Sequence, residues 1–312
     1  MLNTPLQQIP TNIITGFLGV GKSTAIAQLL RNKANSERWA VLVNEFGKVG
    51  VDGALLSGTT SDSPSIFIRE VPGGCLCCAA SVPMQVALNQ LLKEARPDRL
   101  LIEPTGLGHP KQIIAALSKP EYHSVLNLRS TITLVDARKI ADSRYTNHPT
   151  FNQQLEVADL IVANKSDLYS DHELDTLRHY LKRAGLGSTP LHAVSEGAVE
   201  SSWLNQQPHT SPPLISAEQP PIDEFHSQGW SFDSDTCFDF ESLKSLFSQL
   251  QVIRLKAVIR TDRGLFAFNG VDENLQYVEL AQLELSRVEV IDTQPASWEG
   301  LEDQLIQCQI SG

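Results

Sequence analysis

The first two thirds of the chain alternate short apolar runs with longer amphipathic stretches. Short, nearly continuous apolar runs predict buried strands, whereas apolar positions that recur every three or four residues predict helices. Strands are expected at 12–17, 39–46, 65–71, 99–106, 130–137, 159–167 and 190–195, and helices at 23–33, 82–95 and 172–185. Strands that alternate with helices indicate an α/β fold whose mainly parallel sheet is covered on both faces.

This pattern stops near residue 205 and resumes near residue 225 in another form. Segment 205–224 contains five prolines and little periodicity, so we expect an extended linker. The residues after it predict a smaller α+β domain with helices at 239–250 and 297–307 and strands at 229–233, 252–262, 264–271, 277–283 and 286–292. The predicted domains are therefore 1–204 and 225–312.

The net charge and the N-terminal sequence exclude some kinds of partner and location. The 312 residues contain 25 Lys and Arg against 36 Asp and Glu, a net charge of -11. This balance argues against sequence-independent binding to nucleic acid or to anionic lipid. No apolar run is long enough to cross a membrane, and the N-terminus lacks the basic-then-apolar order of a signal peptide. We therefore expect a cytoplasmic protein with reduced thiols and with no nucleic-acid or membrane partner.

A glycine-rich loop provides the most specific motif. Residues 16–23, GFLGVGKS, fit G-x-x-x-x-G-K-[ST] at every fixed position, between an expected strand and an expected helix. Such a loop turns backbone N–H groups towards phosphates, and the following helix directs its positive end at them. We expect Lys22 to bridge the β- and γ-phosphates as a catalytic residue, and the Ser23 hydroxyl to bind Mg²⁺.

A second motif predicts which base is bound. Asn164, Lys165, Ser166 and Asp167 follow an apolar strand, more than a hundred residues after the phosphate loop. The Asp167 carboxylate can accept hydrogen bonds from both N1–H and N2–H₂ of guanine, a pairing that adenine cannot supply. Asn164 is expected to brace the loop, and the aliphatic stem of Lys165 to lie against the base. The predicted nucleotide is GTP.

Two further strand ends carry acidic residues. Glu103 is expected to hold the Mg²⁺ shell or the attacking water, and the Gly106 N–H to meet the γ-phosphate so that its loop senses hydrolysis. Glu45 is a candidate for nucleotide and Mg²⁺ binding at the rim of the sheet. Asp52 is either a similar candidate or a solvated loop carboxylate. Because no arginine finger stands out and no glutamine follows Gly106, we expect slow intrinsic hydrolysis.

Three of the five cysteines lie within four positions, at Cys75, Cys77 and Cys78. They precede an expected helix, whose N-terminus favours thiolates, and thiolates are suitable ligands for Zn²⁺ or Co²⁺. No second cysteine or histidine pair supplies a closed site, so an open, loading site is predicted. Two alternatives remain: small cysteines buried in a core, and a redox-sensing pair at Cys77 and Cys78.

Together these motifs resemble the CobW-type metallochaperone GTPases, which are related to the urease- and hydrogenase-maturation GTPases. The resemblance rests on ITGFLGVGKST, NEFGKVGVDGALL, GGCLCC, IEPTGLGHP, LVDA, NKSDL, GWSF and RLKAVIRTDRGLFAFNGV. It implies a P-loop GTPase domain, a smaller C-terminal domain, and delivery of Zn²⁺ or Co²⁺ to a client metalloprotein. By position it implies that the phosphates are held by Gly16, Gly19, Val20, Gly21, Lys22, Ser23 and Thr24, that guanine is held by Asn164, Lys165 and Asp167, and that the metal is held by Cys75, Cys77 and Cys78.

The chain departs from this family pattern at two places. Lys48 stands where members often have an acidic residue, and the proline-rich segment replaces a histidine-rich tract. His109 is either a fourth metal ligand or a surface histidine. The predicted function is a GTPase whose GTP-bound form holds metal tightly and whose hydrolysis releases it, with a GTP-dependent homodimer as a candidate assembly. Two competing predictions are a redox-sensing regulatory GTPase without metal transfer, and a scaffold that binds GTP without turnover.

Overall fold

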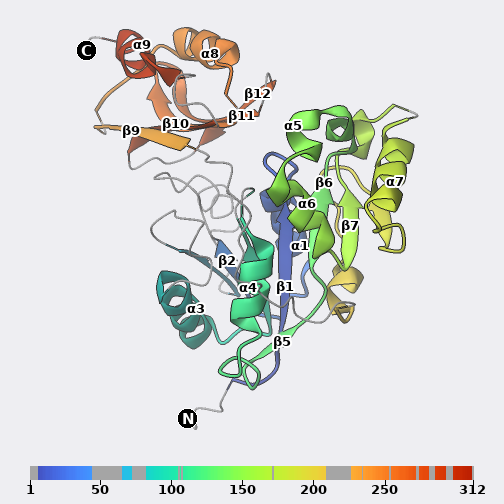
Figure 1. The fold of residues 1–312 in the computed structure, drawn as a ribbon. Coiled ribbons are helices and arrows are strands. Elements are labelled where there is room, and N and C mark those ends of the chain that lie inside the picture. The colour runs from blue at the N-terminus through green and yellow to red at the C-terminus, as the bar shows by residue number, and fades with distance from the viewer. Residues whose placement is uncertain are drawn as a thin grey trace. The chain divides into compact units, whose positions relative to one another are not determined.

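The computed structural model describes two compact units. It describes residues 6–43, 65–71, 82–104, 106, 108–170, 172–208, 226–233, 235–252, 254–271, 274–280, 285–292 and 298–310. Of these, residues 6–208 form the first unit and residues 226–310 the second (Figure 1). Within the described ranges, no helix is long and apolar enough to cross a membrane.

The first unit is built on a parallel sheet. Its strand order is β3-β2-β4-β1-β6-β7-β8, with β5 also paired to β1, and all of the described pairings are parallel. The strands are β1 (Ile9–Gly16), β2 (Trp39–Val43), β3 (Ile66–Glu70), β4 (Arg99–Glu103), β5 (Leu126–Leu128), β6 (Ile132–Val135), β7 (Leu160–Ala163) and β8 (Leu191–Ala193). Every residue of β2, β6 and β7 is buried, as expected for a sheet covered on both faces. The predicted α/β domain is confirmed.

Helices connect these strands. They are α1 (Lys22–Asn32), α3 (Val82–Ala95), α4 (Pro110–Leu117), α5 (Ser143–Thr146), α6 (Pro149–Glu156) and α7 (Glu173–Arg183), with 3₁₀ turns η2 (Ala137–Ala141), η3 (Ser166–Leu168) and η4 (Ser201–Asn205). The sequence prediction named α1, α3 and α7 but not α4 to α6. These three span eight, four and eight residues, too short to show a strong helical period. Proline at the first helical position, Pro110 and Pro149, was the available signal for two of them.

The second unit is an antiparallel sheet with two helices. Its order is β12-β11-β10-β13-β9, from β9 (His226–Phe232), β10 (Arg254–Thr261), β11 (Gly264–Val271), β12 (Asn274–Leu280) and β13 (Ser286–Asp292). Side chains of α8 (Phe240–Gln249) and α9 (Leu301–Gln307) share one buried apolar core with this sheet. That core includes Trp230, Phe238 and Phe268. The predicted smaller α+β domain is confirmed, although β12 begins three residues earlier than expected.

The parallel sheet explains why distant motifs meet. In parallel strands all carboxyl ends lie at one edge of the sheet, and ligands bind outside that edge. Strand β1 lies between β4 and β6, and β6 pairs with β7. The loops that follow β1, β4, β6 and β7 therefore come together, and they contain most of the predicted nucleotide-binding residues (Figure 1).

Candidate nucleotide-binding site

The loop between β1 and α1 requires glycine where the prediction placed it. Gly16, Gly19 and Gly21 have φ angles of 142°, 68° and 96°. A Cβ on Gly16 would lie 2.4 Å from the carbonyl oxygen of Leu134, and one on Gly21 would lie 2.5 Å from Nδ2 of Asn164. Glycine is the residue that adopts these angles without steric cost. The loop therefore packs closely against the carboxyl ends of β6 and β7.

The lysine of this loop points back into it. Lys22 is 6% exposed, and its Nζ donates to the carbonyl oxygens of Gly16 at 3.0 Å and Phe17 at 3.2 Å. Its ammonium group is thus held inside the loop, where the N-terminus of α1 also contributes positive potential. Val20 is buried, whereas Thr24 is exposed on the first turn of α1.

The predicted Mg²⁺ ligand and the acid at the end of β4 are neighbours. The Ser23 hydroxyl donates to Oε1 of Glu103 at 2.9 Å, across 80 positions of sequence. Glu103 is 3% exposed, so its carboxylate is withdrawn from bulk water. A hydroxyl and a carboxylate oxygen at this spacing fit the oxygen donors that Mg²⁺ prefers.

Gly106 brings the loop after β4 against the phosphate loop. A Cβ on Gly106 would lie 2.6 Å from Cδ2 and 2.9 Å from the backbone nitrogen of Leu18. The Gly106 carbonyl accepts a hydrogen bond of 2.9 Å from Nε2 of Gln154 on α6. The sequence prediction did not name Gln154, because a glutamine within a short helix carries no pattern that marks it.

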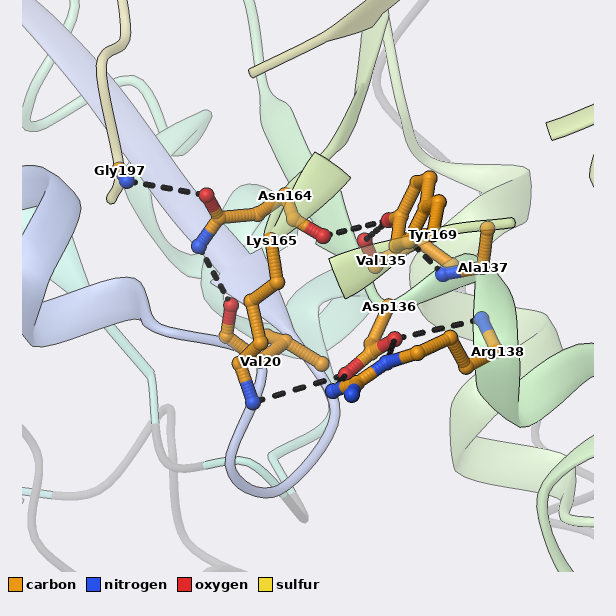
Figure 2. A network of polar contacts seen from close by, with 9 residues as sticks. All are labelled: Val20, Val135, Asp136, Ala137, Arg138, Asn164, Lys165, Tyr169 and Gly197. Carbon is orange, nitrogen blue, oxygen red and sulfur yellow. Dashed lines mark hydrogen bonds and ion pairs between the residues drawn. The ribbon is translucent and has the colours of Figure 1, made fainter. Parts of the chain in front are cut away.

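Asn164 joins the phosphate loop to the loop after β7. Its Nδ2 donates to the carbonyl oxygen of Val20 at 2.9 Å, and its Oδ1 accepts from the Gly197 N–H at 2.9 Å (Figure 2). The Tyr169 hydroxyl donates to the Asn164 carbonyl and accepts from the Ala137 N–H at 3.0 Å. Burial raises the pKa of Tyr169 to about 12, so this hydroxyl remains protonated and able to donate.

Lys165 lies beside a buried acid–arginine pair. Its backbone is left-handed, with φ 63°, and its Nζ lies 3.5 Å from Oδ2 of Asp136 (Figure 2). Asp136 is 3% exposed and accepts from Arg138 Nε at 2.9 Å and from Arg138 Nη2 at 2.6 Å. Burial opposes ionisation of Asp136, but the Arg138 hydrogen bonds and the Lys165 charge outweigh it and lower the pKa of this carboxyl.

Asp167 remains exposed in η3, with its carboxylate accessible to a ligand. The segment after β8 closes this side of the site: the Ser166 N–H donates to the Val194 carbonyl at 3.0 Å. A Cβ on Gly197 would lie 2.7 Å from the backbone nitrogen of Ala25 in α1. The sequence prediction missed this segment, whose signal is the Ser-Glu-Gly turn that follows an expected strand.

Several predicted residues lie outside the described part of the chain. They are Glu45, Lys48, Asp52, Cys75, Cys77 and Cys78. Among the described residues, no group of three or more His, Cys, Asp or Glu side chains could hold a metal ion. His109 is half-buried, and its Nδ1 lies 3.0 Å from Oε1 of Gln153 on α6.

Comparison with known proteins places this site in a family. Residues 10–187, more than half of the chain, match the model described as the CobW/HypB/UreG nucleotide-binding domain. The chain belongs to this family. As a member, it is 38% identical to the zinc chaperone YeiR of Escherichia coli (strain K12), over 96% of this chain and 98% of YeiR. It is 30% identical to the zinc chaperone CobW of Sinorhizobium sp, over 80% of each chain. It is also 28% identical to the zinc-regulated GTPase metalloprotein activator 1 of Schizosaccharomyces pombe, over 56% of this chain and 43% of that protein.

Proposed function

We propose that this CobW/HypB/UreG family protein hydrolyses GTP and uses the cycle to bind Zn²⁺ and transfer it to a client metalloprotein. The observation that carries the proposal is that the Asn164 side chain joins the carbonyl of Val20 to the N–H of Gly197. It links a phosphate-binding loop and a base-binding loop into one nucleotide site. Relatives named as zinc chaperones support zinc as the cargo.

The phosphate end of the site, formed around Lys22, Ser23, Glu103 and Gly106, supplies the groups for hydrolysis. Lys22 Nζ, now held by the Gly16 and Phe17 carbonyls, turns to the β- and γ-phosphate oxygens when GTP enters. Ser23 and Glu103, with Glu45 as a further ligand, would hold Mg²⁺. Bound there, Mg²⁺ would neutralise the charge that develops on the phosphates. The Gly106 N–H meets the γ-phosphate, and turnover is slow because no arginine finger is supplied from within the described site.

The base end of the site, formed around Asp136, Asn164, Lys165 and Asp167, supplies specificity for guanine. Asp167 accepts the two guanine donors, and the stem of Lys165 covers one face of the base, with its ammonium beside Asp136. Asn164 and the 194–197 segment hold this loop against the phosphate loop. Adenine lacks the matching donors, so ATP is rejected.

The cargo site consists of Cys75, Cys77 and Cys78. Thiolates favour Zn²⁺, and Co²⁺ is a second cargo that the same ligands accept. In this proposal GTP binding brings the thiolates together and hydrolysis loosens them, so the client receives the ion from the GDP form.

The test uses Co²⁺ as a spectroscopic substitute for Zn²⁺. The reduced protein is titrated with Co²⁺, and thiolate-to-cobalt absorption is compared with that of a variant in which Cys75, Cys77 and Cys78 are serine. Cys237→Ser is the matched control, since Cys237 lies in the second unit and outside the motif. The proposal expects a strong band in wild type and in the control but none in the triple variant, together with hydrolysis of GTP and not of ATP. No band in wild type, with oxidant-dependent hydrolysis, would instead support a redox-sensing GTPase.

A further inference from the structure

Gln154 is a buried amide at the centre of α6. It is 1% exposed, and its Nε2 donates to the carbonyl oxygens of Gly106 at 2.9 Å and Gly108 at 3.4 Å. Its own backbone carbonyl accepts from the Thr133 hydroxyl on β6 at 2.7 Å. Two carbonyl acceptors fix which end of the amide is nitrogen, because the oxygen end would repel both. Gln154 therefore connects the loop after β4, through its side chain, to β6, through its backbone carbonyl.

Gly106, which the Gln154 side chain holds, needs a hydrogen bond that limits its backbone. Gly106 has no Cβ and therefore the widest backbone freedom of any residue. Its backbone lies against Leu18 of the phosphate loop, where an added Cβ would be only 2.6 Å from the leucine side chain. A hydrogen bond to the Gly106 carbonyl limits the ψ rotation of Gly106, and so helps to keep this residue in place beside the phosphate loop.

The oxygen of the same amide is not used within the described part of the chain. Oε1 of Gln154 is buried and has no hydrogen-bond partner among the described residues. An unpaired buried acceptor costs stability, and each such group calls for an explanation. The amide nitrogen of Gln154 is hydrogen-bonded and its oxygen is not. This suits a loop with two arrangements, and in one of them a backbone N–H reaches Oε1.

Two other contacts of α6 link the same two loops. Phe151 packs edge-on to Phe17 of the phosphate loop, with ring centroids 6.0 Å apart, and Gln153 contacts His109. The helix thus touches the phosphate loop on one side and the loop after β4 on the other.

We propose that Gln154 is the positioning residue for recognition of the γ-phosphate: it holds Gly106 in register with the phosphate loop and exchanges its hydrogen bonds when GTP replaces GDP. This inference rests on the proposed GTPase function. Because GDP has no γ-phosphate, loss of this support weakens binding of GTP far more than binding of GDP.

The test compares Gln154→Leu with Gln153→Leu. Both substitutions are made on the same helix, but only the first removes the bond to Gly106. Affinities for GDP and for a slowly hydrolysed GTP analogue are measured by calorimetry, and hydrolysis by single turnover. For Gln154→Leu we expect the ratio of GTP-analogue to GDP affinity to fall about tenfold, with a similar loss in hydrolysis rate. For Gln153→Leu we expect the ratio to change less than about twofold.

Equal losses for both nucleotides, or none, would overturn the inference, because a merely structural residue does not distinguish GTP from GDP. If Gln154→Leu fails to fold, Gln154→Glu answers the same question, since a carboxylate cannot donate to the two carbonyls at neutral pH. Failure of the wild-type protein to hydrolyse GTP would refute the proposed function. Wild-type hydrolysis with an unchanged ratio in the Gln154 variants would refute this inference alone.

Discussion

The two ends of the nucleotide site are built from different interactions. The base end is held by charged and amide side chains, with Asp136 between Arg138 and Lys165, and Asn164 between two loops. At the phosphate end, side chains mostly hold backbone groups: Lys22 and Gln154 donate to glycine carbonyls, and Gly106 packs against the phosphate loop. GDP and GTP carry the same base and differ only in the γ-phosphate, so we expect the base end to meet the same group in both. The comparison suggests that the base end sets affinity for guanine nucleotides, whereas the phosphate end distinguishes GTP from GDP.

The largest effect expected at the phosphate end follows from Lys22→Ala. Removing the ammonium leaves the β- and γ-phosphate charge without its cation, so hydrolysis should fall by roughly 100-fold or more. Phosphate release at saturating GTP measures this loss, with circular dichroism to confirm the fold. Near wild-type turnover would mean that the protein binds GTP as a scaffold, without catalysis by this loop.

Gly106→Ala tests whether the same end senses the third phosphate. The new Cβ would meet Leu18, and a displacement of the loop by about 1 Å should cost up to about 100-fold in hydrolysis. GDP affinity should change little, because GDP lacks the γ-phosphate that the Gly106 N–H is proposed to contact. Equal weakening of GDP and GTP binding, measured by calorimetry, would show that the two ends are not separable.

Asp167→Asn tests the base end. Losing one charge-assisted hydrogen bond should lower affinity for GTP and GDP alike by about 30-fold. Hydrolysis of xanthosine triphosphate should improve, since the asparagine amide can donate to the additional carbonyl of xanthine. A loss confined to GTP, in a competition assay with both nucleotides, would contradict the comparison.

Asp136→Asn should have the smallest effect on nucleotide binding. Its effect on the free energy of unfolding, however, should depend on pH. We expect about 1.5–3 kcal/mol lower free energy of unfolding at neutral pH, from the lost charged hydrogen bonds of Arg138. The folded-state pKa of Asp136 lies below its ordinary value of 3.8, so its stabilisation is present above that value and is lost as pH falls through the folded pKa.

Thermal melts at pH 7 and at pH 3 measure this difference between wild type and variant. The gap in melting temperature should shrink at the acidic pH, while GDP and GTP affinities fall by a similar small factor, about fivefold or less. A gap that is constant with pH would show that the carboxylate charge does not stabilise the base end.

The sequence predicted the parts of this site that depend on fixed residue types. Gly16 and Gly21 have backbone angles that other residues rarely adopt, and Lys22 follows them at a fixed spacing. Asn164 lies in a second short motif, NKSD, so a pattern marks it as well. The alternation of strands and helices likewise predicted the parallel sheet. In such a sheet the carboxyl ends of the strands share one edge.

The remaining parts have no such pattern. Gln154 contacts Gly106 across 48 positions, and Asn164 contacts Val20 across 144, so only the folded chain reveals these partners. The loop that contains Val194 and Gly197 acts through backbone groups, and its Ser-Glu-Gly sequence marks a turn but not the contacts that the turn makes. The roles of Cys75, Cys77 and Cys78 stay predictions from motif and family alone.

The measurement that tests the central claim most directly is Zn²⁺ affinity in two nucleotide states. Competition with a chelator gives the dissociation constant with Mg²⁺ and a slowly hydrolysed GTP analogue, and again with GDP. The account predicts tighter Zn²⁺ binding with the GTP analogue, and an equal factor by which Zn²⁺ strengthens binding of the analogue relative to GDP. A hundredfold preference would correspond to about 2.7 kcal/mol of coupling. Equal Zn²⁺ affinity in both states would contradict GTP-controlled zinc transfer.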